Sequence, residues 1–142
     1  MLKFKTMKKT IVFLFCLCFV ATATFAQKLN AKKVPAVVTA AFAKRHASVT
    51  KVSWEMEKTN YEAGFTLDGK ETSEVYTAQG VWVESEVEIK VAELPDAVKM
   101  KLKGKKVAEA AKITKADGTV VYEAEVGGKD LLFDAKGNMV KP

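Results

Sequence analysis

Apolar and polar residues alternate along several short runs of the chain, which is the pattern of half-buried strands. In the first run Val52, Trp54 and Met56 alternate with polar residues. The same two-residue period recurs over residues 61–67 and 120–126. Strict alternation places apolar side chains on one side of a sheet and polar side chains on the other. The pattern therefore predicts antiparallel strands with one packed face and one open face.

Two other stretches have the spacing of helices, because their apolar residues recur three or four positions apart. Pro35 and Pro95 suit the first helical turn, where a missing N–H costs nothing. Gly104 is a favourable helix stop after the second stretch. The apolar stripe is Val34, Val38, Ala41 and Phe42 in the first stretch and Leu94, Val98 and Leu102 in the second.

The two helical stretches open segments that match in kind and order. Tyr-Glu-Ala, for example, occurs at 61–63 and again at 122–124, at the same distance from each stretch to within one residue. We therefore interpret the chain as two repeats, at about 34–90 and about 94–142. The predicted fold class is α+β, with two tandem helix-plus-antiparallel-meander repeats forming one curved antiparallel sheet with helices on one face.

Residues 1–26 have the three parts of a secretory signal peptide. Lysines precede an unbroken apolar run of ten residues, Ile11 to Val20, and a small-x-small pattern ends at Ala26. The run is shorter than the about 20 residues that a membrane span needs. We expect cleavage near Ala26, a single domain at 27–142 without a membrane span, and a periplasmic or secreted location.

Removing the signal peptide changes both the charge and the cysteine content. The whole chain has 23 basic and 17 acidic residues, and four of the lysines lie in the signal. The remaining 19 basic and 17 acidic groups give a net charge of +2 rather than +6. This balance does not favour nucleic-acid binding. Cys16 and Cys18 also leave, so the domain has no disulfide, zinc–thiolate site or cysteine nucleophile.

Catalytic motifs are absent from the sequence. His46 is the one histidine, and it follows the first helical stretch, where a cation stabilises a helix end. A histidine base needs a nucleophile and an orienting partner, and no pattern indicates either. The nucleophile-elbow, zinc-protease, phosphate-loop and dinucleotide motifs do not occur. We therefore predict a protein that is not an enzyme, with no catalytic residue, metal site or cofactor.

The run over residues 81–90 carries the candidate binding site. Its alternation puts Trp82 on one side together with Glu84, Glu86 and Glu88. If the valines face the core, this side is solvated, and tryptophan is enriched among binding hot spots. The alternative is that Trp82 packs on neighbouring strands or lies under a loop. The glutamates are about 7 Å apart along the strand, which is too far for one calcium site.

Five short motifs occur in a fixed order between residues 52 and 98, within a resemblance that covers nearly all of residues 27–142. They are Val52-Ser53-Trp54-Glu55, Tyr61-Glu62-Ala63-Gly64-Phe65, Asp68-Gly69-Lys70, Gly80-Val81-Trp82-Val83-Glu84-Ser85-Glu86 and Leu94-Pro95-Asp96-Ala97-Val98. The set resembles the PepSY-like, or beta-lactamase-inhibitor-like, secreted bacterial domains. It departs from that family at 45–47, where members often carry Tyr-Pro-Gly. The resemblance implies export, tandem helix-plus-sheet units in a curved sheet and, by analogy, inhibition or protein binding.

These observations lead to one function hypothesis and two alternatives. The first is an exported non-enzymatic binding module that acts on a protein partner through the open sheet face, with inhibition of a peptidase or another hydrolase as a specific form. The second is a small-molecule or envelope-ligand binding protein with a pocket between helix and sheet. The third is an enzyme of unrecognised type. A broad face favours the first, and a closed apolar pocket of about 300 Å³ or more favours the second.

Overall fold

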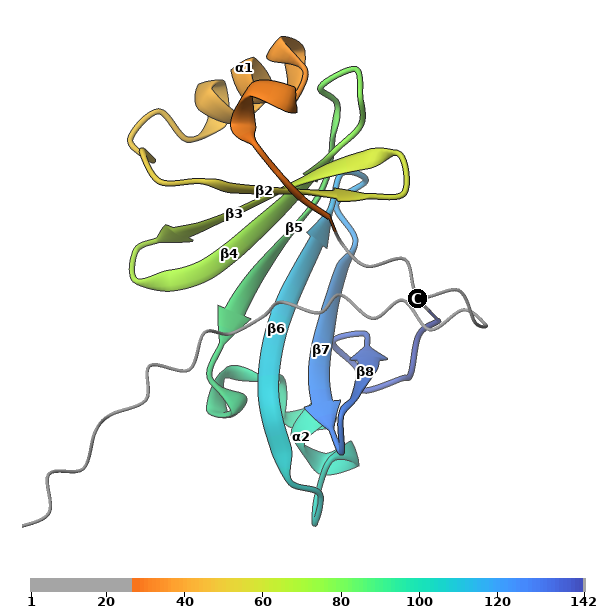
Figure 1. The fold of residues 1–142 in the computed structure, drawn as a ribbon. Coiled ribbons are helices and arrows are strands. Elements are labelled where there is room, and N and C mark those ends of the chain that lie inside the picture. The colour runs from red at the N-terminus through yellow and green to blue at the C-terminus, as the bar shows by residue number, and fades with distance from the viewer. Residues whose placement is uncertain (1–26, 142) are drawn as a thin grey trace, which may run out of the picture.

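The computed structural model describes residues 27–141, so the predicted signal peptide lies outside the described residues (Figure 1). The strands are β1 Gln27–Leu29, β2 Ser53–Glu57, β3 Asn60–Leu67, β4 Lys70–Tyr76, β5 Trp82–Ile89, β6 Val107–Lys115, β7 Val120–Val126 and β8 Lys129–Phe133. The α-helices are α1 Ala36–Arg45 and α2 Asp96–Lys101, and the 3-10 helices Ala31–Lys33 and Val91–Glu93 precede them. Within 27–141, the helices are too short or too polar for any of them to cross a membrane.

The eight strands form one antiparallel sheet in the order β1 to β8, so each strand pairs with its neighbours in sequence. This corrects the predicted fold class, because two helix-plus-meander repeats are wrong. β5 and β6 pair over six positions, from Glu84↔Lys115 to Ile89↔Ala110, so the ladder continues where the repeats were expected to divide. Only α1, with ten residues, is longer than two turns, whereas α2 has six. Pairing satisfies backbone groups that two separate units would leave free.

The ends of the sheet are short. β1 has three residues and pairs with β2 from Gln27↔Met56 to Leu29↔Trp54. At the other end, an isolated bridge joins Phe133 of β8 to Met139. Figure 1 shows the sheet twisting strongly between these two ends, as the right-handed twist of strands requires.

Both α-helices pack on the same face of the sheet, which we call the helix side. Near β2 to β4, Val38 and Phe42 of α1 pack with Trp54, Phe65 and Tyr76 in the first hydrophobic cluster. The ring of Phe42 meets the rings of Trp54 and Phe65 edge to face, with centroids 5.7 Å and 5.0 Å away. Such edge-to-face pairs are a favoured arrangement of aromatic rings.

The second hydrophobic cluster lies near β6 to β8. Val98 of α2 is fully buried there, and Leu94 and Leu102 are buried just outside the two ends of the helix. The sheet contributes Ala124 and Phe133. The apolar stripe predicted from the sequence is therefore buried although the helix itself is short. Figure 1 shows α1 and α2 at opposite ends of the sheet.

A close contact between α1 and the β4–β5 turn makes one stability prediction. Gly80 has φ +77°, and a Cβ there would lie 2.7 Å from the carbonyl oxygen of Val37. Gly69 has the same φ, but a Cβ there would meet no atom within 4 Å. The left-handed backbone disfavours either alanine by about 1–2 kcal/mol, and overpacking at Gly80 adds about 1–3 kcal/mol. Urea unfolding should therefore show Gly80→Ala to be clearly less stable than Gly69→Ala; equal stabilities would contradict this packing.

Candidate functional site

The face opposite the helix side, which we call the open face, is rich in carboxylates. The strand register places there Glu55, Glu57, Glu62, Glu71, Glu84, Glu86, Glu88, Glu123, Glu125 and Asp130. Two lysines share this face among its paired residues, because Lys28 pairs with Glu55 and Lys115 pairs with Glu84. The face is therefore formally strongly acidic, although the domain as a whole is not.

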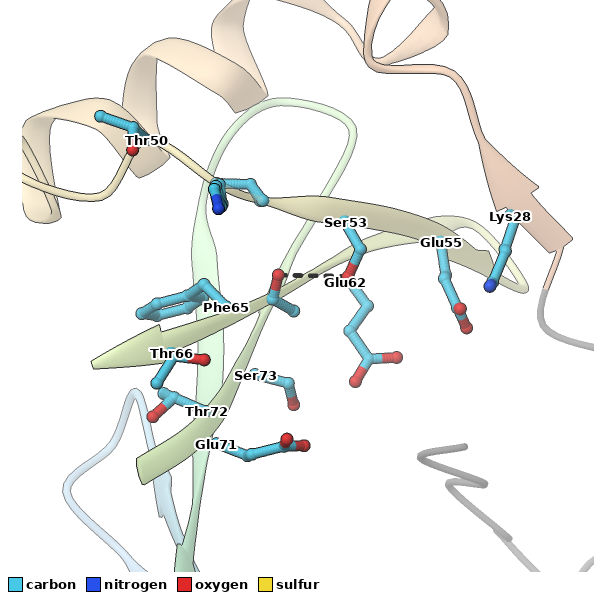
Figure 2. A pocket seen from close by; sticks show the side chains of 13 residues that line it. Lys28, Thr50, Ser53, Glu55, Glu62, Phe65, Thr66, Glu71, Thr72 and Ser73 are labelled. Atoms are coloured by element: carbon cyan, nitrogen blue, oxygen red, sulfur yellow. Dashed lines mark hydrogen bonds between the residues drawn. The ribbon is translucent and has the colours of Figure 1, made fainter. Parts of the chain in front are cut away.

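A hollow of about 630 Å³ lies on this face over β2 to β4 (Figure 2). Its floor is made of Ser53, Gly64 and Ser73, which pair with one another in register across the three strands. The hydroxyl of Ser53 donates to the carbonyl oxygen of Gly64 at 3.1 Å. Because the two serine side chains are short and Gly64 has none, the surface of the sheet is recessed there.

Most of the residues in the walls of the hollow are polar. The rows of the sheet on either side of the floor provide Glu55 and Glu62 on one side and Thr66 and Glu71 on the other. Lys28 and Lys51 also line the hollow, together with the apolar side chains of Val52 and Phe65. Figure 2 shows the carboxylates of Glu55, Glu62 and Glu71 around the space above the floor.

Glu86 continues the floor row on β5, opposite Ser73. Only 4% of the residue is exposed, and its Oε2 is buried and accepts no hydrogen bond from the residues that the structure describes. Burial raises the pKa of Glu86 to about 9, and the charges of Glu123 and Glu62 add to the shift. The carboxyl group of Glu86 is therefore protonated and neutral at pH 7.

The neighbours of Glu86 on the open face have the same tendency. Burial raises the pKa of Glu123 to about 7, with a further contribution from Asp130. Burial also raises the pKa of Glu62, of Glu84 and of Asp130. Desolvation and like charge both disfavour ionised carboxylates, so this face retains protons at a pH at which isolated carboxylates have lost them.

The structure separates Trp82 from the predicted site glutamates. The β4–β5 register shifts between Val75 and Tyr76, so that Tyr76 pairs with Trp82 while Val75 pairs with Glu84. This irregularity turns Trp82 to the helix side, where it packs against the first hydrophobic cluster. Glu84, Glu86 and Glu88 remain together on the open face. The expected shared face is thus wrong for Trp82, and a binding role for any of the four residues stays a prediction.

On the helix side, Trp82 belongs to a polar network that the sequence pattern did not reveal. Its indole N–H donates to Ser85 Oγ at 3.0 Å, and the guanidinium of Arg45 lies 4.3 Å from its ring centroid. Glu74, only 2% exposed, is the hub, because it accepts from Arg45, Ser85 and Tyr76. Burial alone would raise the pKa of Glu74, but the hydrogen bonds outweigh it and lower the pKa. The network ties the end of α1 to β4 and β5.

His46 caps the C-terminal end of α1, as its sequence position suggested, but it is largely buried. Its ring contacts those of Phe42 and Phe65, with centroids 5.1 Å and 4.7 Å away. His46 Nε2 lies 3.0 Å from Glu74 Oε2 without the alignment of a hydrogen bond. A serine that is activated as a nucleophile donates its hydroxyl hydrogen to a histidine base. The Ser85 hydroxyl donates instead to Glu74, at 2.7 Å, so Ser85 and His46 are not paired in this way.

The carboxylates of the open face are not arranged as a metal site. Between residues 27 and 141, no group of three or more His, Cys, Asp or Glu side chains has a geometry that could hold a metal ion. Along β5, Glu84, Glu86 and Glu88 follow one another at intervals of two positions. The face therefore presents its acidic groups over an area rather than at a point.

Comparisons with known proteins give matches at the level of structure. No family model matches the chain, and no curated protein matches it. A protein of Bacteroides eggerthii described as "putative periplasmic" has a TM-score of 0.70 at 22% identity, covering 75% of this chain and 86% of that one.

Two further solved structures match over the same 75% of the chain. A DUF2874 family protein of Bacteroides uniformis has a TM-score of 0.69 at 24% identity, with 86% of that protein covered. A BLIP-like protein of Bacteroides fragilis has a TM-score of 0.63 at 21% identity, with 83% covered. The chain therefore shares the fold of these proteins, in agreement with the beta-lactamase-inhibitor-like resemblance of its motifs.

Proposed function

We propose that the chain is an exported, non-enzymatic binding module that recognises a protein partner through the open face. The observation that carries the proposal is the character of that face. Neither helix covers it, and its carboxylates greatly outnumber the lysines that share it, Lys28, Lys51 and Lys115. A surface of this kind attracts a basic partner and repels an acidic one.

The size of the sheet fits a protein partner. Eight strands about 4.8 Å apart span roughly 34 Å, and β2 to β8, with five to nine residues each, are about 17–30 Å long. The resulting area is comparable with the about 800 Å² that each partner buries in a standard interface. The partner therefore has room to bind without displacing either helix.

The structural neighbours support the setting of this proposal. One is described as "putative periplasmic" and another as BLIP-like, and residues 1–26 have the pattern of an export signal. Inhibition of a peptidase or another hydrolase is the specific form of binding that the family resemblance suggests. Fold-level likeness alone does not select an enzyme as the partner.

A small ligand is the second candidate, because the hollow of about 630 Å³ has a size typical of ligand sites. This hollow lies on the open face and not between helix and sheet, where the sequence pattern predicted a pocket. Its polar walls would suit a cationic ligand better than an apolar one.

Charge reversal tests the proposed face. A variant with Glu55→Lys and Glu88→Lys should capture the partner from envelope extract at least about tenfold less well than the wild type, because close charge pairs contribute several-fold each. The matched control combines Glu93→Lys with Asp96→Lys, which makes the same charge change at two exposed residues, the last of the 3-10 helix before α2 and the first of α2. Quantitative mass spectrometry of the captured proteins measures the difference. Equal losses in the two variants, or none in either, would contradict recognition through the open face.

A further inference from the structure

We infer that the partner places an arginine or lysine side chain, carried on a short extended segment, in the hollow with its cationic group beside Glu86. This inference rests on the proposed function and specifies the chemistry of the partner. It stands on the shape of the hollow, on the buried and unpartnered Glu86 carboxyl group, and on the carboxylates around it.

The row of residues that forms the floor of the hollow leads to Glu86, which lies just outside the residues that line the hollow. Ser53, Gly64 and Ser73 form its floor in register across β2, β3 and β4, and the next residue of the same row is Glu86. A chain that lies over the floor and crosses the strands therefore arrives at this carboxyl group. The small floor residues allow the stem of a long side chain to lie close to the sheet, as lysine and arginine stems do on apolar or small surfaces.

The carboxyl group of Glu86 lacks the partner that its burial calls for. Its Oε2 accepts no hydrogen bond from residues 27–141. Beyond Glu86, the same row of the sheet continues with Ile113 on β6 and Val121 on β7. The side chains of these two residues cannot donate a hydrogen bond. Leaving a buried polar atom unsatisfied is unfavourable, because the atom has lost its hydrogen bonds to water without gaining others. A donor brought by a partner would remove that cost, and a cationic donor would also suit the surrounding carboxylates.

The dimensions favour a peptide segment over an ion. A volume of about 630 Å³ is about twenty times the 30 Å³ that one water molecule occupies in the liquid. An isolated cation would leave most of the hollow to solvent, whereas several residues of an extended chain would occupy it. Guanidinium and carboxylate groups also match in geometry and pair through two hydrogen bonds.

When the cation binds, the carboxyl group of Glu86 would release its proton. The titratable groups that face Glu86 are Glu62 on β3, Glu71 on β4, Glu84 and Glu88 on β5, Lys115 on β6, Glu123 on β7 and Asp130 on β8. Burial raises the pKa of Glu86 to about 9 and that of Glu123 to about 7. An arriving cation favours the ionised carboxylate, so the carboxyl proton passes to the buffer. Affinity should therefore increase as the pH rises from 6 to 8.

Isothermal titration calorimetry with a defined probe tests the inference. The probe is an acetylated and amidated peptide with the composition Gly-Ser-Arg-Arg-Ser-Gly, and its control carries citrulline, which is isosteric with arginine but uncharged. The arginine peptide should bind the purified protein at least about tenfold more tightly, a difference of about 1.4 kcal/mol. Titrations in two buffers of different ionisation enthalpy should show proton release, and affinity should rise about fivefold or more from pH 6 to pH 8.

Variants then assign the effect to Glu86. Glu86→Gln keeps the shape of the side chain and should lower affinity at least about tenfold, with loss of most of the proton release. Glu125→Gln removes a carboxylate from the same face outside the hollow and should change affinity by less than about twofold. Glu62→Gln, in the wall of the hollow, is a second variant and should weaken binding about threefold or more. Circular dichroism confirms that each variant is folded.

Two outcomes would overturn the inference. The first is equal affinity for the arginine and citrulline peptides. The second is an equal effect of Glu86→Gln and Glu125→Gln, which would indicate general attraction to an acidic surface. If partner capture depends on the open face but is unchanged by Glu86→Gln, the proposed function stands and this inference fails. If capture does not depend on that face at all, the proposed function fails first.

Discussion

Raising the pH from 5 to 9 should lower the free energy of unfolding by about 5 kcal/mol, mostly through Glu86. The pKa of this carboxyl group is raised from 4.5 to about 9 in the folded protein. The folded state therefore keeps a proton that the unfolded state has released, so stability falls as the pH rises between these two values. Each pKa unit corresponds to about 1.4 kcal/mol. The raised pKa of Glu123, about 7, acts in the same direction.

At the acidic end the sign is opposite. Hydrogen bonds lower the pKa of Asp134, and of Glu74 against the effect of its burial, so the stability that these groups provide is lost as the pH falls below about 4. The protein should therefore be most stable near pH 5. Urea unfolding at pH 5, 7 and 9 measures the profile.

Glu86→Gln tests whether the buried carboxyl group of Glu86 causes this pH profile. The variant should be more stable than the wild type at pH 9, and its stability should depend much less on pH. Glu125→Gln serves as the control and should retain the wild-type slope. A wild-type protein whose stability is the same at pH 5 and pH 9 would mean that the Glu86 side chain is solvated.

Phe42→Ala should destabilise the protein by about 3–5 kcal/mol, the range for large aromatic residues truncated in a core. Phe42 is 4% exposed, and its ring contacts those of Trp54, Phe65 and Tyr76. Within α1, only Phe42 and Val38 are buried. Truncation therefore leaves a cavity and removes one of the two buried side chains that attach this helix to the sheet. Chemical denaturation, followed by far-ultraviolet circular dichroism, measures the loss.

The control for this prediction lies on the same helix. Val37 is 51% exposed, so Val37→Ala should change stability by less than about 0.5 kcal/mol. If Phe42→Ala cost less than about 1 kcal/mol, α1 would not depend on its aromatic contacts. If both variants cost the same, the helix would be held mainly by its connections.

The sequence pattern predicted the local elements better than their assembly. The alternation over 61–67 corresponds to β3, and the run over 120–126 corresponds to β7. Four strands, β1, β4, β6 and β8, were not predicted. For β1 the reason is that three residues are too few to show a period. The two-repeat interpretation was wrong because matching motifs describe segments one at a time, whereas the hydrogen bonds between β5 and β6 depend on how segments meet.

The candidate site was predicted in part, for the same kind of reason. Glu84, Glu86 and Glu88 share the open face, as alternation requires. Trp82 does not, because the register shift between β4 and β5 reverses the alternation before Glu84, and a bulge leaves no clear mark in a polar and apolar pattern. The Glu74 network had one visible signal, namely a glutamate two positions before Tyr76 and therefore on the same side of the strand.

The short ends of the sheet bear on how this protein behaves at high concentration. An antiparallel sheet that is not closed into a barrel tends to recruit further strands, and long flat margins promote fibril growth. At one edge of this sheet, β1 has only three residues that could pair with another strand, and one of them is Lys28. At the other edge, Met139 of the same chain already pairs with Phe133 of β8. A second molecule would therefore find little backbone to pair with on either side. We expect the protein to resist ordered aggregation at high concentration while its broad acidic surface remains available.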